Sequence, residues 1–194
     1  MTGVEQGPDG KPRCPWALGT SDYLDYHDHE WGRPLHGEHE LFERLTLEAF
    51  QSGLSWLTIL RKRENFRRAF DGFDVDQVAG YGAKEVNRLL ADAGIIRNRR
   101  KIEATITNAR AVHELHANNE TLDELVWSFA PDEPGPAPET LEDLEPTTPG
   151  SKALAKELKA RGFVFVGPTT AYASMQAAGL VNDHLMGCAF RLRH

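Results

Sequence analysis

The chain has little cysteine, with only Cys14 and Cys188 among its 194 residues. It also lacks internal repeats, an apolar signal region at its start and any apolar run long enough to span a bilayer. A chain of this length can bury a core without disulfides. We therefore expect a cytoplasmic protein with no membrane partner, in which both thiols stay reduced and available to a metal ion.

Each cysteine has a histidine at the spacing of metal ligands. Twelve residues separate Cys14 from His27, and three separate His184 from Cys188. Two thiolates and two imidazoles form the closed tetrahedral set that zinc prefers at structural sites. One structural Zn²⁺ on these four residues would tie the two ends of the chain together. The alternative is that the cysteines are ordinary buried thiols and the histidines are surface residues.

Negative charge predominates, with a formal net charge of −7, but it is unevenly distributed. Residues 117–150 hold nine acids and no Lys or Arg, so leaving this segment out changes the net charge to +2. The basic residues that remain fall in two clusters, Arg61–Arg68 and Arg97–Lys101. These clusters are either solvated helix faces or a surface that faces the phosphates of a nucleic acid, and composition does not decide between the two.

Helical periodicity dominates and predicts an all-α fold. Apolar stripes predict a helix over His39–Gln51, another over Ala83–Ala93 and a third through Ile102 and Val112. Gly94 is placed as the C-terminal cap of the second helix.

The C-terminal third is predicted to hold two more helices. Ser151 would cap one that stops near Gly162, and Thr169 or Thr170 would cap the next. Only Phe163–Val166 reads as extended. We expect residues 1–12 to be a flexible tail, residues 13–194 to form a single domain, and residues 130–150 to be an exposed acidic loop rich in proline.

Residues 93–99 connect two predicted helices through a tight hairpin. Such a hairpin can point backbone N–H groups at a phosphate, and its arginines would add charge. Ile95 and Ile96 would anchor the turn in the core. Most short loops between helices bind nothing, so the hairpin becomes informative only beside a second site.

Glu48 suggests that second site, because it lies three residues after Leu45 and seven after Leu41 on a helix. This spacing places a carboxylate on or beside the apolar stripe. A carboxylate there needs a partner or a raised pKa, unless it sits at the edge of the stripe and reaches water or an arginine.

Four aromatic residues favour a pocket around Glu48. Trp16, Tyr23 and Tyr26 crowd the stretch between Cys14 and His27, and Trp56 lies two turns beyond the glutamate. Large rings together with one carboxylate can form a stacking slot for a flat, cationic ligand.

Several blocks of the chain occur in the order and spacing of one known family. The blocks are Arg13–Trp16, Tyr26–Gly32, Glu48–Trp56, Arg63–Phe66, Ala93–Arg97 and Gln176–His184. From about Arg13 to Cys188 the chain closely resembles the 3-methyladenine DNA glycosylase I family, constitutive alkylation-repair glycosylases of the helix-hairpin-helix superfamily.

The resemblance implies a helix-hairpin-helix glycosylase fold in which a zinc site on Cys14, His27, His184 and Cys188 joins the two terminal segments. It implies excision of 3-methyladenine from double-stranded DNA by hydrolysis of the N-glycosidic bond. It also implies a pocket in which Glu48 bonds the extruded base, the rings of Tyr26 and Trp56 stack on it, and Trp16 and Tyr23 line the walls. Residues implied to contact DNA are Gly53, Leu54, Gly94, Ile95, Arg97 and Arg99.

One departure from other helix-hairpin-helix glycosylases concerns the catalytic acid. Those enzymes generally use an aspartate after the hairpin, whereas Ile95–Leu122 contains none. Glu48 is therefore the candidate catalytic acid, either as a water activator or as a base contact. No lysine nucleophile stands out, which indicates a monofunctional enzyme, and a monomer is the simplest expectation.

Two other functions fit parts of the sequence. A zinc-dependent hydrolase would need an open coordination position, and His29, His36 and His39 could extend the metal site. A non-catalytic, zinc-containing binder of damaged DNA would keep the pocket without the chemistry.

Overall fold

The computed structural model describes residues 3–192, which form a mostly helical body. The α-helices are α1 (Ser21–His29), α2 (Glu38–Gln51), α3 (Trp56–Ala69), α4 (Val75–Ala79), α5 (Ala83–Ala91), α6 (Arg99–Ala117), α7 (Leu122–Trp127), α8 (Pro149–Ala160) and α9 (Pro168–Ala177). Single 3₁₀ turns are η1 (Pro15–Gly19), η2 (Asp71–Phe73) and η3 (Leu141–Asp143), and the strands are β1 (Glu5–Gln6) and β2 (Pro12–Arg13). Over residues 3–192, none of the helices combines the length and the apolar character that crossing a membrane requires.

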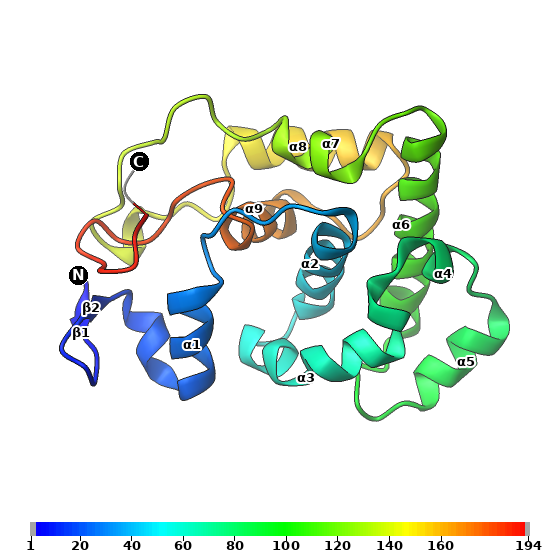
Figure 1. Ribbon diagram of the computed structural model, residues 1–194, viewed down its shortest axis with the longest axis horizontal. Helices are drawn as coiled ribbons and strands as arrows, with labels where there is room; N and C mark the ends of the chain where they lie inside the picture. Colours follow the sequence, from blue (N-terminus) through cyan, green and yellow to red (C-terminus); the bar gives the residue numbers. More distant parts are fainter. Residues whose placement is uncertain (1–2, 193–194) are drawn as a thin grey trace.

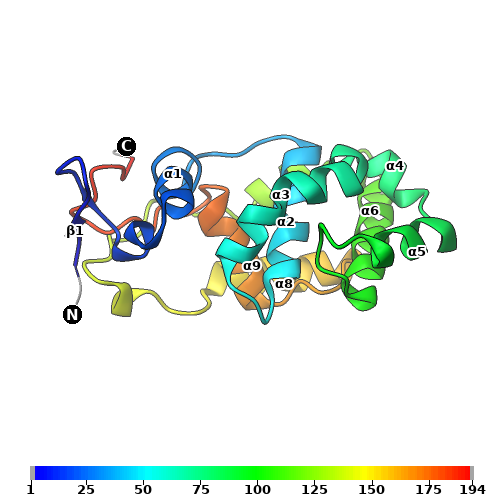
Figure 2. The ribbon, with the colours of Figure 1, turned by 90° about the horizontal axis from the view of Figure 1, so that it is seen from below.

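Helix α2 runs through the middle of the molecule, with α3, α6, α7 and α9 around it (Figures 1 and 2). Its apolar stripe is buried, and Leu41, Phe42, Leu45 and Phe50 are each at most 3% exposed. Burying four side chains of this size stabilises the fold by roughly 6–12 kcal/mol, an upper estimate. The helix predicted over His39–Gln51 is confirmed.

The second predicted helix differs at its end. Helix α5 stops at Ala91 and Asp92 is its cap, so the prediction that Gly94 caps the helix is wrong. Gly94 instead lies within the connection to α6, where its backbone N–H donates to Asp92 Oδ1 at 2.7 Å. The chain thus leaves α5 through a turn closed by the hydrogen bond from Gly94 to the Asp92 side chain, and not through the left-handed glycine cap that the sequence predicts.

The caps of the last two helices also differ from the predictions. Thr148, and not Ser151, caps α8, and the two residues exchange backbone-to-side-chain bonds of 2.9 and 3.0 Å. Helix α9 begins after Gly167 without a side-chain cap, so Thr169 and Thr170 lie inside it. Both helices have a proline at the first helical position, and this proline places each helix start a few residues before the predicted one.

The two ends of the described chain meet at one end of the molecule (Figure 1). Residues predicted to be a flexible tail include β1, which pairs with β2 as an antiparallel hairpin. The C-terminal segment bonds to this hairpin, because Ala189 N donates to Pro12 O at 2.9 Å. The all-α prediction omitted this small sheet, which is too short to show a periodicity of its own.

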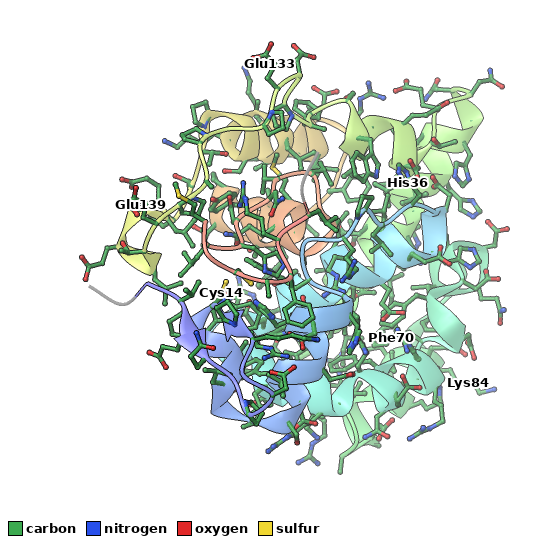
Figure 3. All side chains as sticks on the ribbon, turned by 60° about the vertical axis from the view of Figure 1, so that its left-hand side comes forward. Cys14, His36, Phe70, Lys84, Glu133 and Glu139 are labelled. Carbon is green, nitrogen blue, oxygen red and sulfur yellow. The ribbon has the colours of Figure 1, made fainter. Side chains whose placement is uncertain are left out.

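The acidic segment between α7 and α8 runs along the surface as an irregular loop with one turn, η3. The side chains of Glu133 and Glu139 point outward from it (Figure 3). Its inner side is fixed to the C-terminal segment, since Met186 N donates to Pro138 O at 2.7 Å.

Candidate functional site

The two cysteines and two histidines of the sequence motif lie together in the fold. The ligand atoms of Cys14, His27, His184 and Cys188 are all within 4.8 Å of one another, and all four residues are buried. Figure 3 shows Cys14 where the N-terminal and C-terminal segments meet. The cluster can hold a metal ion.

The donor set fits a tetrahedral metal. The two facing ring nitrogens lie 3.1 Å apart, and three nitrogen-to-sulfur separations are 3.5, 3.5 and 3.9 Å. In a tetrahedral zinc site, bonds of about 2.0 Å to nitrogen and about 2.3 Å to sulfur would place two nitrogens about 3.3 Å apart and a nitrogen and a sulfur about 3.5 Å apart. Each histidine points one ring nitrogen into the cluster, and a neighbouring protein group contacts its other ring nitrogen. His27 Nδ1 lies 2.8 Å from Asp28 Oδ1, and His184 Nε2 lies 3.0 Å from Trp31 O. Metal-binding histidines typically have such outer partners.

The cluster adjoins an aromatic cavity. The ring of Trp16 lies 5.1 Å from that of His27, and the ring of Trp31 lies 4.7 Å from that of His184. Both tryptophans line a cavity of about 270 Å³. A metal ion would therefore fix the histidines that support one wall of this cavity.

Every residue predicted to contact a base lines this one cavity. Its wall consists of Trp16, Tyr23, Tyr26, Trp31, Glu48, Gln51 and Trp56. The structure thus brings together η1, α1, α2 and the start of α3, which are separated in the sequence. The roles of these residues in binding a base remain predictions.

Hydrogen bonds hold the two tyrosines, and a ring contact holds Trp56 against Tyr26. Tyr23 OH accepts from Leu57 N at 3.0 Å, and Tyr26 OH accepts from Arg44 at 3.1 Å. The rings of Tyr26 and Trp56 are 5.5 Å apart and tilted by 44°. Because hydrogen bonds and ring contacts fix these side chains, the cavity has a preformed aromatic lining.

Among residues 3–192, Glu48 is the one acidic or basic residue in the cavity wall, and it is 5% exposed. Burial raises the pKa of its carboxyl from the ordinary 4.5 to about 7, and the positive charge of Arg44 limits this rise. The nearest cationic atom is Arg44 Nη1, 3.9 Å from Glu48 Oε1, which is too far for a hydrogen bond. The carboxylate oxygens are therefore available to a ligand.

Sequence reasoning missed Trp31, Gln51 and Arg44. Gln51 follows Glu48 by three residues on α2, so helical spacing places it beside the glutamate, whereas Trp31 lies beyond the end of α1 at His29, where helical spacing does not apply. Arg44 precedes Glu48 by four residues on the same helix. The sequence reasoning allowed for a nearby arginine partner but assigned none.

The loop between α2 and α3 exposes Gly53 and Leu54, the latter 40% exposed. Gly53 has a φ of +82°, a conformation that favours glycine. The loop is anchored by Lys101, whose Nζ donates to Phe50 O at 2.8 Å and to Ser52 O at 2.6 Å. Leu54 is an exposed apolar tip on a fixed loop beside the cavity.

The hairpin predicted at residues 93–99 falls in the connection between α5 and α6. Ile95 is buried as predicted, and Lys62 of α3 donates to the carbonyls of Ala93 and Gly94 at 3.1 and 3.2 Å. Arg97 and Arg99 are exposed. The turn is thus fixed to α3 and presents two arginines to solvent.

Many members of the basic clusters are paired with protein groups. Arg61, Arg63 and Arg67 bind Asp22, Glu30 and Glu43, while Lys101 holds the loop after α2. Arg99 also pairs with Glu103, at 3.2 Å, whereas the exposed Arg97 and Arg100 beside it have no ion pair within residues 3–192. The interpretation of the basic clusters as a surface that faces phosphates therefore applies only to the predicted hairpin and the first turn of α6.

A second hairpin, at residues 161–167 between α8 and α9, was missed by sequence reasoning. It exposes Val164 and Phe165, and Phe165 has a φ of +62°. Arg100 lies over the Phe165 ring at 5.8 Å, so this turn adjoins the first turn of α6. Gly162 and Gly167 at either side could have marked the segment as a tight turn.

Comparisons with known proteins point to one family. The methyladenine glycosylase family model matches residues 16–192. DNA-3-methyladenine glycosylase 1 of Escherichia coli (strain K12) is 49% identical over 177 residues, which cover 91% of this chain and 95% of that protein.

Solved structures extend the similarity to the fold. A crystal structure of a 3-methyladenine DNA glycosylase I covers 93% of this chain and 100% of its own, with 47% identity and a TM-score of 0.89. A variant of such an enzyme in complex with 3-methyladenine covers 94% of this chain and 98% of its own, with 34% identity and a TM-score of 0.88. The chain belongs to the methyladenine glycosylase family.

Proposed function

We propose that this protein is a DNA repair enzyme that excises 3-methyladenine by hydrolysing its N-glycosidic bond. The observation that carries the proposal is the preformed aromatic cavity with a single buried carboxyl, Glu48. An enzyme that acts on a base must take it out of the helical stack, and a damaged base costs less to extrude. The cavity offers such a base a stacking site next to the exposed tip at Leu54.

The chemistry of the lesion matches the cavity. Methylation at N3 gives the base in DNA a positive charge, so electron-rich rings and a carboxylate attract it more than neutral adenine. We assign stacking to Tyr26 and Trp56, the walls to Trp16 and Tyr23, and a charge-assisted contact to Glu48. These interactions supply a discrimination of about 2–4 kcal/mol.

The reaction itself needs little activation. As the bond between the sugar C1′ and the base N9 breaks, its electron pair neutralises the cationic base, which leaves as free 3-methyladenine. A water adds to C1′ and releases a proton, and the DNA keeps an abasic sugar. In the part of the chain that the structure describes, no lysine lines the cavity, which supports a monofunctional mechanism without a Schiff base.

We further propose that DNA is bound as a duplex by a helix-hairpin-helix surface. Gly53 and Leu54 would enter the gap left by the base, and the turn with Gly94, Ile95, Arg97 and Arg99 would contact the backbone. Lys101 links these two segments, and Phe165 with Arg100 extends the surface to the second hairpin.

The metal is proposed to be one structural Zn²⁺ on Cys14, His27, His184 and Cys188. Four protein ligands fill a tetrahedron, so no position is left for a catalytic water. His29 and His36 bond to Asp25 and Asp123 rather than to the cluster, which argues against the zinc-dependent hydrolase. We propose that the enzyme acts as a monomer in the cytoplasm, where its thiols stay reduced.

Base release tests the proposal. The protein is incubated with duplex DNA that carries 3-methyladenine, and the released base is identified by mass. We expect free 3-methyladenine and abasic sites in unbroken strands. Tight binding to the lesion without release would establish the non-catalytic binder instead, and a covalent adduct trapped by borohydride would contradict the monofunctional mechanism.

A further inference from the structure

Arg44 is buried in the wall behind the cavity, with 7% of its surface exposed. It lies one helical turn before Glu48 on α2, so both charged side chains project from the same side of the central helix. Fully buried arginines are rare unless they are paired. The contacts of the Arg44 guanidinium therefore indicate its role in the cavity.

One guanidinium contacts three groups of the cavity. Arg44 Nη1 donates to Tyr26 OH at 3.1 Å and lies 3.9 Å from Glu48 Oε1. Its central carbon is 5.6 Å from the ring centre of Tyr26 and 5.3 Å from that of Trp56. Arg44 thus orients a ring and acts on the carboxylate by charge while leaving the carboxylate oxygens without a hydrogen bond from it.

The far side of Arg44 is held by a second ion pair. Its Nη2 lies 4.0 Å from Glu30 Oε2, and Glu30 accepts two hydrogen bonds from Arg63 at 2.5 and 2.8 Å. The Nε of Arg44 has no hydrogen-bond partner within residues 3–192. Buried charges with incomplete hydrogen bonding often cost stability relative to apolar residues of similar size. The stability of the fold alone does not explain an arginine here.

We propose that Arg44 is a positioning residue whose charge favours the ionised form of Glu48, so that a carboxylate with free oxygens can meet the cationic base. This inference rests on the proposed function. A buried carboxyl without a cation nearby favours its neutral form, and a neutral carboxyl loses its charge attraction for the lesion.

Few other charges face Glu48. Among the groups packed on α2, burial raises the pKa of the Tyr26 hydroxyl, and Glu30 and Arg63 form an ion pair. Lys101 of α6 donates to the carbonyls of Phe50 and Ser52 at the end of α2. Helix α9, which packs on α2, contains no acidic or basic residue between Pro168 and Ala177. Within residues 3–192, Arg44 is therefore the cation that lies within ion-pair distance of Glu48, and its charge opposes the effect of burial.

Three substitutions separate the charge of Arg44 from its bulk. Arg44→Met keeps an unbranched side chain without charge, and Arg44→Lys keeps the charge. Arg161→Met is the matched control, because Arg161 pairs with Glu120 and Glu157 on the surface and lines no part of the cavity. Thermal melting establishes that each variant is folded.

Two readouts follow the ionisation of Glu48 between pH 5 and pH 9.5. One is the NMR titration of the labelled Glu48 carboxyl in the full chain, and the other is the midpoint of the acid limb of kcat/KM for base release. For Arg44→Met we expect both midpoints to move up by at least about one pH unit from the wild-type value of about 7. This shift would make base release at pH 7 about fivefold slower. Arg44→Lys and Arg161→Met should keep the wild-type midpoint.

An unchanged midpoint in Arg44→Met would overturn the inference, as would an equal shift in Arg44→Lys or in Arg161→Met. If the wild type releases no base at any pH, the proposed function fails. The NMR titration still tests the effect of Arg44 on Glu48 in that case, so the two failures are distinguishable.

Discussion

Replacing Glu48 by glutamine removes the ionisable group of the cavity while keeping its shape, so it isolates the energetic cost of the buried charge. The folded-state pKa of about 7 lies above the ordinary value of 4.5. Folding therefore favours the protonated carboxyl. The stability from this preference is fully present below pH 4.5 and is lost as the pH rises through 7. The total loss is about 3 kcal/mol, of which about 2.5 kcal/mol falls between pH 5 and pH 8.5.

Glu48→Gln lacks this titration, so its stability relative to the wild type should rise by about 2.5 kcal/mol from pH 5 to pH 8.5. Urea unfolding of both proteins at the two pH values measures the difference, and the titrations of all other groups cancel in the comparison. Glu114→Gln, on the exposed face of α6, is the control and should show no such trend. A difference between Glu48→Gln and the wild type that stays constant with pH would refute the assignment of a raised pKa to Glu48.

Two further predictions concern the metal and the DNA contact. Cys14→Ser should lower the bound zinc from one per chain to near zero and reduce the melting temperature, because the cluster fastens the two terminal segments. If a folded, metal-free protein lost turnover and regained it with cobalt or manganese, the structural role of the metal would be wrong. Leu54→Ala should change stability by less than about 0.5 kcal/mol, since the side chain is exposed, yet slow excision from duplex DNA by about tenfold. An equal loss on single-stranded DNA would show that Leu54 does not act in extruding the base.

The helix around Glu48 and the cluster of cysteines and histidines could be predicted from the spacing of residues along the chain. The Cys and His pairs and the helix around Glu48 follow from positions that are local in the sequence, and the fold preserves both. The sequence predicts that Trp16 and Trp56 surround Glu48, and in the structure all three residues line one cavity. Family resemblance added the blocks that connect these local signals.

Other features depend on contacts between distant segments. The β1–β2 hairpin is held partly by the C-terminal segment, and Lys101 serves the loop after α2 instead of a phosphate. Arg44 is explained by a cavity that exists only once α1, α2 and α3 are assembled. The pattern of charge and periodicity along the chain does not predict these partners, because the contacts form only through tertiary packing.

The most direct test of the account is the single-turnover rate of 3-methyladenine release from duplex DNA by the wild type, Glu48→Gln and Glu114→Gln at pH 7.5. Loss of a buried charge-assisted contact should slow Glu48→Gln by about 10- to 100-fold, while Glu114→Gln should match the wild type. Release by Glu48→Gln at the wild-type rate would contradict the claim that the Glu48 carboxylate recognises the lesion.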